Sequence, residues 1–472
     1  MRRTKIICTI GPASESEEKL KALILAGMNV ARFNFSHGSH EEHEAKFKRL
    51  RRIRIAMNMP TATLLDTKGP EIRLRNFKNG KVTLKRGDRF TLTTDQIIGD
   101  EHRAAISYPG LVHDVKKGSH ILIDDGLIGL KVDEVKGHDI LCTVENGGPV
   151  SDKKGVNVPD AELSMPFISE QDRSDIEFGC ALGFDFIACS FTRTADDIRA
   201  VRKILDAHHS KMQVIAKIES TQGVRNIEEI MDVADGVMVA RGDLGVEVPL
   251  EEVPVIQKRI INLAQRKGKI VITATQMLDS MIHNPRPTRA EATDVANAVY
   301  DGTTAVMLSG ETAAGAYPVE AVQTMAKIAR RAEEDINYLE RRLSLLRNDA
   351  VARDETTAIC HACCTVAEEI GAAAIITVTI SGFTARRLSR LRPTVPVIAC
   401  TTNARVACQT NLLYGVVPLI IGMEDSEDAL FAAALARADM TGLVKKGDKI
   451  VLTAGLPLGS SGNTNMIRII EV

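Results

Sequence analysis

The segment Gln213-Val214-Ile215-Ala216-Lys217-Ile218-Glu219 is an apolar run that ends with a lysine and a glutamate two positions apart. Because side chains alternate between the two faces of a β-strand, Lys217 and Glu219 lie on the same face. Burying two charges at the end of an apolar strand is costly unless each has a partner, a ligand or a metal ion. The segment therefore predicts either a functional site or a structural ion pair at a strand end.

Strand-like and helix-like segments alternate on both sides of this run, which predicts a parallel α/β fold. The predicted strands are Lys5–Ile10, Asn29–Ser36, Thr61–Asp66, Phe184–Ser190, Gln213–Ile218, Gly236–Ala240, Lys269–Ala274 and Thr304–Leu308. Eight parallel strands, each followed by a helix, form a closed (β/α)8 barrel of the TIM-barrel type. We assign residues 1–70 and 166–345 to this barrel and expect one long helix, Val319–Leu346, at its end.

Polar side chains collect where these strands end, although a buried strand is expected to stay apolar there. They are Arg32, Asn34, Ser36, Asp66, Lys217, Glu219, Arg241, Asp243, Thr275 and Glu311. Active sites of such barrels lie at the carboxyl ends of the strands. The sequence therefore predicts that these side chains share one mouth.

Two further regions differ from the barrel in their sequence pattern. Residues 71–165 consist of short alternating segments separated by glycine-containing turns, which predicts an inserted antiparallel β module without helices. This module, which we expect to be a small β-barrel, leaves from the third strand and returns through Lys153-Lys154-Gly155. It is placed to act as a lid that excludes water from the mouth. Residues 346–472 predict a separate C-terminal α/β domain.

Two loops in the C-terminal region are rich in glycine and hydroxyl side chains and follow predicted strands. Such loops offer backbone N–H groups and hydroxyls to a phosphate, but ordinary turns have the same composition. No lysine or arginine lies inside either loop. The candidate phosphate-binding residues are Thr379, Ser381, Gly382, Thr384, Ser460, Gly462 and Thr464.

Composition limits the classes of function. The 472 residues include 60 basic and 61 acidic side chains, so the balance of charge favours neither nucleic acid nor a membrane surface as a partner. No apolar run is long enough to span a membrane, and the N-terminus does not resemble a signal peptide. The nine cysteines lie mostly in apolar segments, which is typical of reduced thiols in the cytoplasm. For Cys360-His361-Ala362-Cys363-Cys364 we expect ordinary helix packing rather than zinc binding.

The predicted mouth contains the groups that phosphoryl transfer needs. Glu219 and Asp243 offer carboxylate ligands for Mg2+ or Mn2+, while Lys217 and Arg32 neutralise negative charge. No Walker-type loop and no kinase glycine-rich loop is present, so a nucleotide must be held by other means. A second oxygen-rich cluster, with one acid, suits a monovalent cation or forms a hydrogen-bonded network. Its members are Asn34, Ser36, Asp66 and Thr67.

Six segments, in this order and spacing, resemble the pyruvate kinase family along essentially the whole chain. They are Asn34-Phe35-Ser36-His37-Gly38, Asp66-Thr67-Lys68-Gly69-Pro70-Glu71-Ile72-Arg73, Lys153-Lys154-Gly155-Val156-Asn157, Ile215-Ala216-Lys217-Ile218-Glu219, Ala240-Arg241-Gly242-Asp243-Leu244-Gly245 and Ala274-Thr275-Gln276-Met277-Leu278. The resemblance implies an enzyme that converts phosphoenolpyruvate and ADP into pyruvate and ATP in glycolysis. It also implies a homotetramer and a C-terminal domain that regulates activity.

The resemblance assigns roles within the mouth. Glu219 and Asp243 would hold the divalent metal, and Lys217 would lie against the transferring phosphoryl group and stabilise the enolate. Backbone groups of Gly242 and Asp243, with the Thr275 hydroxyl, would receive the substrate carboxylate. Thr275 would also lie near the face on which the enolate carbon is protonated.

The resemblance also assigns the neighbouring groups. The cluster that contains Asp66 matches the potassium site of the family, and Glu71 matches the acid of potassium-dependent members. The residues matched to nucleotide phosphates or to the reacting groups beside them are Arg32, Asn34, His37, Arg73 and Lys154.

The C-terminal loops match the family's effector site in outline, which implies a sugar-phosphate or nucleotide effector. Ile380 and Phe383, however, stand where regulated members carry basic residues. Asp160 replaces a usual glycine near the lid hinge. Because the chain stops at Val472, we expect no appended phosphohistidine-type domain of the kind that some bacterial members carry.

Two other functions fit part of the pattern. A metal-dependent aldolase or lyase on the same barrel could use a similar pair of acids, but it would not require Lys154 on a lid or a potassium cluster. Pyruvate release without ADP would identify such a lyase. A catalytically inactive metabolite-binding protein is the third reading, and measurable turnover would exclude it.

Overall fold

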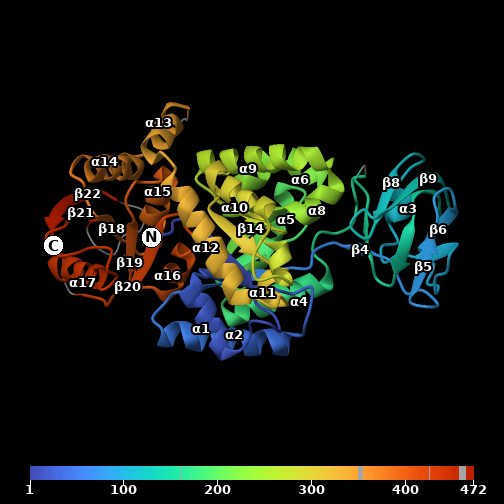
Figure 1. Cartoon of the computed structure of the whole chain (residues 1–472), viewed down its shortest axis with the longest axis horizontal. Helices are drawn as coiled ribbons and strands as arrows, with labels where there is room; N and C mark the ends of the chain where they lie inside the picture. The colour runs from blue at the N-terminus through green and yellow to red at the C-terminus, as the bar shows by residue number, and fades with distance from the viewer. Residues whose placement is uncertain (160, 349–353, 425, 457–463) are drawn as a thin grey trace.

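A computed structural model describes residues 1–159, 161–348, 354–424, 426–456 and 464–472 of the chain. Three parts follow one another along the long axis of the molecule, and Figure 1 shows the β-rich insertion at one end, the barrel in the centre and the C-terminal region at the other end. The expected order of parts is therefore present. None of the described helices is both long and apolar enough to cross a membrane.

Eight parallel strands close the central barrel, as the sequence predicts. They are β1 (Lys5–Thr9), β2 (Val30–Asn34), β3 (Ala62–Asp66), β13 (Phe186–Cys189), β14 (Gln213–Ile218), β15 (Gly236–Ala240), β16 (Ile270–Ala274) and β17 (Ala305–Leu308). Neighbouring strands pair in chain order, and β17 returns to β1 through Lys5 opposite Ala305. The break in the series falls between β3 and β13, where the insertion leaves the barrel.

Helices surround this ring of strands, and side-chain caps start several of them. They are α1 (Glu17–Ala26), α2 (His40–Ala56), α4 (Glu170–Leu182), α5 (Ala195–Ala207), α6 (Thr221–Arg225), α7 (Ile227–Val233), α8 (Arg241–Glu247), α9 (Val253–Lys267), α10 (Arg289–Asp301), α11 (Gly310–Ala313) and α12 (Pro318–Glu334). Two short 3-10 turns, η1 (Leu250–Glu252) and η2 (Asp279–Ile282), complete the ring. Ser16 caps α1, because its hydroxyl accepts from the Lys19 amide at 3.2 Å.

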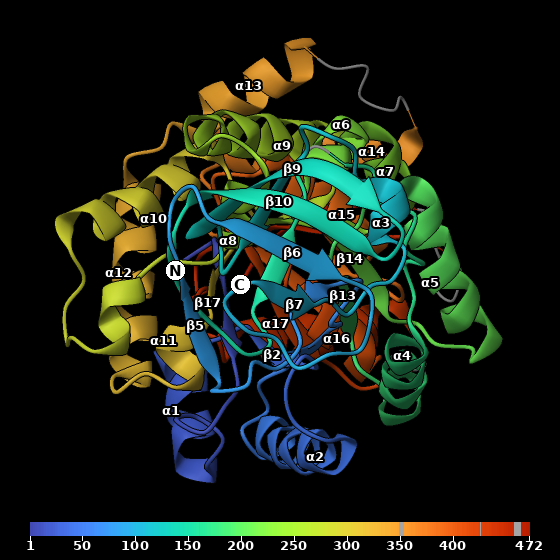
Figure 2. The same ribbon diagram turned by 90° about the vertical axis from the view of Figure 1, so that its right-hand side faces the viewer.

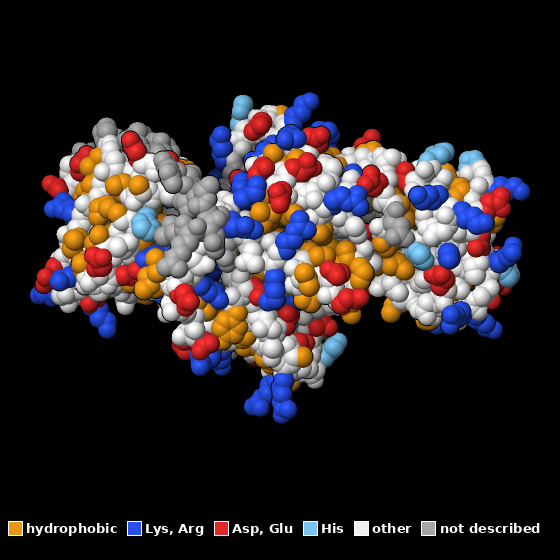
Figure 3. All heavy atoms as spheres, turned by 90° about the horizontal axis from the view of Figure 1, so that it is seen from above, with side chains coloured by type: hydrophobic (Ala, Val, Ile, Leu, Met, Phe, Trp, Pro, Cys, Tyr) orange, Lys and Arg blue, Asp and Glu red, His pale blue; other side chains and the backbone are white. Residues whose placement is uncertain are grey.

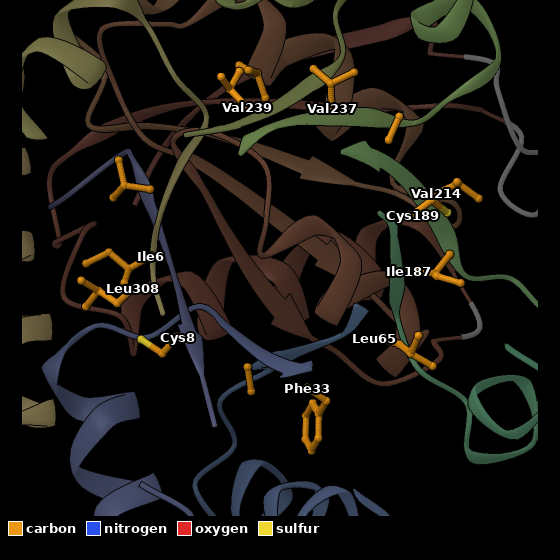
Figure 4. Close-up of a cluster of buried hydrophobic side chains, with 14 of the residues drawn as sticks. Ile6, Cys8, Phe33, Leu65, Ile187, Cys189, Val214, Val237, Val239 and Leu308 are labelled. Atoms are coloured by element: carbon orange, nitrogen blue, oxygen red, sulfur yellow. The ribbon is translucent and has the colours of Figure 1, made fainter. Parts of the chain in front are cut away.

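Strand residues alternate between two apolar clusters. Ile6, Val214 and Val237 pack outward against the helices, and Figure 4 shows such side chains spaced around the ring. Ile7 and Ile215 belong instead to a cluster inside the barrel. That inner cluster continues into apolar side chains of the C-terminal region, so the lower end of the barrel is closed by packing.

The insertion forms a sheet that stands over the carboxyl ends of the barrel strands (Figure 2). Its elements are β4 (Ile72–Arg73), β5 (Lys81–Leu84), β6 (Arg89–Thr93), β7 (Arg103–Ala105), α3 (Leu111–Asp114), β8 (His120–Ile123), β9 (Ile128–Lys136), β10 (Asp139–Asn146), β11 (Gly148–Ser151) and β12 (Gly155–Asn157). Seven strands form one sheet in the order β4-β12-β8-β9-β10-β6-β7, and β5 pairs with β11. An isolated bridge between Leu74 and Ile106 joins the two edges and gives the sheet a barrel-like form.

The insertion departs from the sequence prediction in two respects. Strands β6 and β7 run parallel, so the sheet is not purely antiparallel. Residues Leu111–Asp114 form one helical turn in a region where no helix is predicted. Alternation of apolar residues reports which face of a strand is buried, but it does not report the direction of the neighbouring strand.

The C-terminal region is an α/β sheet with helices on both sides. Its elements are α13 (Tyr338–Asn348), α14 (Glu355–Glu369), β18 (Ala374–Val378), α15 (Phe383–Leu391), β19 (Val397–Thr401), α16 (Ala404–Thr410), β20 (Val416–Ile420), α17 (Glu427–Asp439), β21 (Lys449–Ala454) and β22 (Met466–Glu471). The strand order is β20-β19-β18-β21-β22, and only β22 is antiparallel to its neighbour. Within α14, Cys360, Cys363 and Cys364 are buried thiols, which agrees with the expected helix packing.

The prediction of one long helix before this region is wrong. Helix α12 ends at Glu334, and α13 begins at Tyr338. The Asn337 side chain accepts a hydrogen bond from the Glu340 amide at 3.1 Å. A polar side chain therefore satisfies a backbone N–H group at the start of the second helix. Periodicity of apolar residues alone does not register such a break.

The first strand is tied to the C-terminal region by one buried lysine. Lys5 Nζ donates to the Val416 carbonyl oxygen at 2.6 Å. Burial and the nearby Arg2 lower the pKa of Lys5 to about 7, against the effect of Glu333. Gln409 makes a second link, because its amide donates to the carbonyl oxygens of Asp185 and Lys211. The lower end of the barrel and the C-terminal sheet are therefore joined by polar as well as apolar contacts.

Candidate active site

Lys217 stands at the carboxyl end of β14 among three oxygen-bearing groups. Its ammonium group lies 2.9 Å from Glu219 Oε1 and 3.2 Å from Asp66 Oδ1, and it donates to Ser190 Oγ at 2.7 Å. Its side chain is only 10% exposed. The predicted placement of Lys217 and Glu219 on one face is correct, and Asp66 reaches the same point from β3.

Arg32 holds the other side of Asp66. Its Nε atom lies 2.5 Å from Asp66 Oδ2, and its Nη1 group donates to Thr9 Oγ1 at 2.8 Å. Burial alone would raise the pKa of Asp66, but Arg32 and Lys217 lower it. Burial alone would likewise lower the pKa of Lys217, but Asp66 and Glu219 raise it. Asp66 and Lys217 therefore stay charged inside the protein.

The negative charge of Glu219 is less well compensated by neighbouring groups than that of Asp66. One carboxylate oxygen faces Lys217, and the other accepts from the Phe191 amide at 2.6 Å. Phe191 has a positive φ of 53°, which turns its amide toward the carboxylate. Burial raises the pKa of Glu219 to about 8, with Lys217 opposing the rise and Asp243 adding to it. A cation placed between Glu219 and Asp243 would relieve this unfavourable pairing of charge.

Asp243 lies in the first turn of α8, directly after β15. The neighbouring Gly242 amide donates to Thr275 Oγ1 at 2.8 Å, and the Thr275 hydroxyl donates to the Ala274 carbonyl oxygen at 2.6 Å. Thr275 has a positive φ of 68°, an uncommon backbone conformation for a β-branched residue. The structure therefore joins the predicted Gly242, Asp243 and Thr275 group across two neighbouring strands.

The acids of this mouth fit a divalent ion only in part. The carboxylates of Glu219 and Asp243 lie close enough to interact electrostatically, and carboxylate oxygens are the ligands that Mg2+ and Mn2+ prefer. The described residues contain no group of three or more histidine, cysteine or acidic side chains that could hold a metal on its own. The remaining ligand positions would have to come from substrate and water, which is usual for Mg2+ in phosphoryl-transfer sites.

The candidate potassium ligands lie at or just after the ends of β2 and β3. Asn34 Oδ1 accepts from the Ser36 amide at 3.1 Å, and Thr67 Oγ1 accepts from the Ser190 amide at 3.2 Å. Asp66 is the only acid of the set, and its charge is shared with Lys217 and Arg32. The set therefore consists of neutral oxygens and one carboxylate whose negative charge is partly compensated. Such a set suits a monovalent ion better than a divalent one.

A cavity of about 300 Å3 separates the mouth from the inserted sheet. Lys154 and Arg73 line it from the insertion, and Asp243 lines it from the barrel. Lys154 pairs with Asp124 at 2.8 Å, while Arg73 pairs with Glu71 at 2.8 Å. His37, also a predicted nucleotide contact, is an exposed residue of the rim and does not line this cavity.

The sequence did not predict the contacts of three polar residues, Ser190, Arg241 and Glu311. Ser190 donates to the Thr67 carbonyl oxygen at 2.6 Å and accepts from Lys217, yet it appeared only as the last residue of a strand. Arg241 donates to Asp294 and to the Thr275 carbonyl oxygen, so it braces the loop that follows β16. Glu311 accepts from the amides of Ser309 and Leu278 and has a structural part as well.

The two C-terminal loops approach each other within the described residues. Thr384 Oγ1 lies 2.7 Å from Thr464 Oγ1, and the Gly382 amide donates to Thr379 Oγ1 at 3.0 Å. Ser381 is exposed beside them. Arg387, outside the loops, stacks over the Phe383 ring at 4.9 Å.

Three sequence predictions fall on positions outside the described residues. They are Asp160, Ser460 and Gly462.

Comparisons with known proteins agree with this geometry. The sequence profile of "Pyruvate kinase, barrel domain" matches residues 1–322, and that of "Pyruvate kinase, alpha/beta domain" matches residues 357–470. A pyruvate kinase of Clostridium acetobutylicum is 48% identical over 99% of both chains. One from Geobacillus stearothermophilus is 50% identical over 99% of this chain and 80% of its own. One from Clostridium perfringens is 48% identical over the full length of both. Both domain matches and these full-length identities show that the chain belongs to the pyruvate kinase family of phosphotransferases.

Proposed function

We propose that this chain transfers the phosphoryl group of phosphoenolpyruvate to ADP, giving pyruvate and ATP, as a step of glycolysis in the cytoplasm. The observation that carries the proposal is the convergence of Lys217, Glu219 and Asp66 at one strand-end pocket in a member of this family. We further assign residues 1–70 and 166–345 to catalysis, residues 71–165 to a lid and residues 346–472 to regulation. The assembly proposed is a homotetramer.

The chain's own side chains supply most of the electrostatics of such a transfer. Lys217 is held charged by Asp66 and Glu219, so it can stabilise the negative charge that remains on the enol oxygen when the phosphorus–oxygen bond breaks. Thr275 and the Gly242 amide provide donors for the substrate carboxylate. The enolate carbon then takes a proton on the side facing Thr275, which gives pyruvate.

Glu219 and Asp243 would hold Mg2+ or Mn2+. The ion, when bound, supplies further positive charge for the phosphoryl oxygens. Arg32, Arg73, Lys154 and His37 are the proposed contacts to phosphates, with Lys154 and Arg73 reaching the cavity from the inserted sheet.

The reaction is tested by measuring pyruvate release from phosphoenolpyruvate with and without ADP. We expect pyruvate and ATP to form in equal amounts and only when ADP is present, because the phosphoryl group needs an acceptor. Pyruvate release at the same rate without ADP would instead identify a lyase or phosphatase.

A potassium requirement is the second part of the proposal, with Asn34, Ser36, Asp66 and Thr67 as ligands. Glu71 pairs with Arg73. We expect Glu71→Lys to reduce potassium activation at least fivefold, because a tethered ammonium group would replace the ion near Asp66. The measurement is the initial rate against potassium concentration at constant ionic strength. Glu71→Gln is the matched control, and equal potassium activation in Glu71→Lys and the parent would refute the assignment.

The C-terminal loops are the proposed site of a phosphorylated effector, either a sugar phosphate or a nucleotide such as AMP. The proposal is supported by the approach of Thr384 to Thr464 beside the start of α15. We expect one of these ligands to shift the phosphoenolpyruvate concentration at half-maximal rate at least twofold, and Thr384→Val to abolish the shift. Initial rates unaffected by every candidate would end this assignment.

A further inference from the structure

The chain returns from the insertion to the barrel through residues 163–165, which we call the return segment. Figures 1 and 3 show the insertion at one end of the molecule, beside the barrel and away from the C-terminal region. The side chains of Leu163 and Met165 pack against the apolar core of the insertion. The amide and the hydroxyl of Ser164 donate to the carboxylate of Asp114, at 3.0 and 2.8 Å. The return segment is therefore fixed to the insertion.

One arginine of the barrel holds the return segment from the other side. Arg193 Nη1 donates to the Leu163 carbonyl oxygen at 2.8 Å, and Nη2 donates to the Met165 carbonyl oxygen at 2.9 Å. The Arg193 side chain is only 14% exposed. Asp197 fixes Arg193, because its carboxylate accepts from the Arg193 amide at 2.8 Å and lies 3.8 Å from Nε. The insertion and the barrel are therefore joined by two bonds from one held guanidinium group.

Arg193 lies in the turn after β13, and other residues of this turn contact groups assigned to the transfer. The Phe191 amide donates to Glu219 at 2.6 Å, and Ser190 Oγ accepts from Lys217 at 2.7 Å. Arg193 follows Phe191 by two residues. A displacement of the return segment therefore reaches the hydrogen bond of Glu219 through a very short length of chain.

Other polar contacts across this boundary do not have the same partners. Arg225 pairs with Glu162 at 3.0 Å, but both side chains are largely exposed, and exposed ion pairs contribute little. Asn157, the last residue of β12, donates to Glu247 at 2.9 Å, and Glu247 lies at the end of α8. Arg193 instead joins the return segment directly to the turn that holds Glu219.

We propose that Arg193 is a positioning residue for the phosphoryl transfer, because it joins the lid to the turn that orients Glu219. The lid carries Lys154 and Arg73, the proposed phosphate contacts, and both line the cavity above the mouth. The two bonds from Arg193 therefore set where these cations lie relative to Glu219. The bonds themselves do not depend on any activity, whereas their effect on catalysis rests on the proposed function.

Arg193 also lines this cavity, so direct binding of a phosphate is the competing role. Arg193→Lys separates the two roles, because lysine keeps the positive charge but lacks the planar fork that serves two carbonyl oxygens at once. Hydrogen exchange followed by mass spectrometry, without substrate or metal, measures the loss of the two bonds. We expect exchange at least threefold faster in two peptides of Arg193→Lys, one covering residues 161–168 and one containing the Phe191 amide. Loss of a phosphate contact alone would leave this exchange unchanged.

Arg199→Lys is the matched control for the exchange experiment. Arg199 lies on α5, is exposed, pairs with Asp196 at 2.6 Å and does not line the cavity. Both peptides should exchange in this variant as they do in the parent, and circular dichroism shows whether each variant is folded. Arg193→Lys keeps a cation beside Asp197, which favours folding. Parent-like exchange of either peptide in Arg193→Lys, or equal acceleration in the control, would overturn the proposal.

Steady-state rates test the effect on catalysis. We expect Arg193→Lys to raise both the KM for ADP and the Mg2+ concentration at half-maximal rate at least fivefold, because the lid cations and Glu219 both lose their fixed positions. Arg199→Lys should stay within twofold of the parent in both quantities. A change in the KM for ADP alone, or in neither quantity, would overturn the positioning role. A parent without ADP-dependent turnover would refute the proposed function and this role with it, while faster exchange in Arg193→Lys would still establish the link between the lid and the turn.

Discussion

Lys217→Met is expected to lower kcat by at least about a thousandfold, which corresponds to about 4 kcal/mol of lost transition-state stabilisation. Methionine keeps the length of the side chain but removes the charge that Asp66 and Glu219 hold at the strand end. The interaction with the enol oxygen is strongest when negative charge develops there, so kcat should fall far more than the affinity for phosphoenolpyruvate. Steady-state rates and a substrate-binding titration measure the two quantities.

The same substitution removes a cation from a buried group of charges and therefore requires a check of folding. Lys211→Met changes an exposed lysine before the same strand and should leave kcat within twofold of the parent. Thermal unfolding and circular dichroism show whether Lys217→Met is folded. A folded Lys217→Met enzyme with kcat within tenfold of the parent would contradict the assigned role.

Glu219→Gln is expected to raise the Mg2+ or Mn2+ concentration at half-maximal rate at least tenfold. The amide keeps the size of the side chain and the hydrogen bond from the Phe191 amide, but it is a poorer ligand for a hard divalent ion. Asp243→Asn should have an effect of the same kind, because both acids face the proposed metal position. Initial rates measured against free metal concentration check both variants.

Asp279→Asn is the control for the metal titration. Asp279 is exposed, lies just beyond β16 and is not among the residues assigned to the metal. Its metal dependence should match that of the parent. If all three variants show the parent's metal dependence, Glu219 and Asp243 do not hold the ion.

The barrel was predictable because its signals are local. An apolar strand such as Gln213–Ile218 reveals its two faces by alternation, and closure of the barrel then places the ends of all the strands at one mouth. The convergence of Lys217, Glu219 and Asp66 could therefore be predicted from the sequence alone. The polarity of a strand end is itself a signal, since an unpaired charge is rarely buried there.

The missed features depend on contacts that are distant in the sequence. Ser190 interacts with Lys217 and Thr67, but a serine at the end of a strand gives no sign of such partners. Arg241 and Glu311 were placed at the mouth because they follow strand ends, but the sequence gives no sign of their partners, Asp294 for Arg241 and the Leu278 amide for Glu311.

The bond from Lys5 to the Val416 carbonyl oxygen joins residues 411 positions apart. On the ribosome, the first strand emerges long before its acceptor has been synthesised. Until β20 is in place, the amine of Lys5 has either to stay hydrated or to lose its proton without an acceptor. The N-terminal strand can therefore reach its final environment only after most of the polypeptide has been made. In a chain truncated before Val416, the Lys5 amine at the lower end of the barrel would lack this hydrogen-bond acceptor.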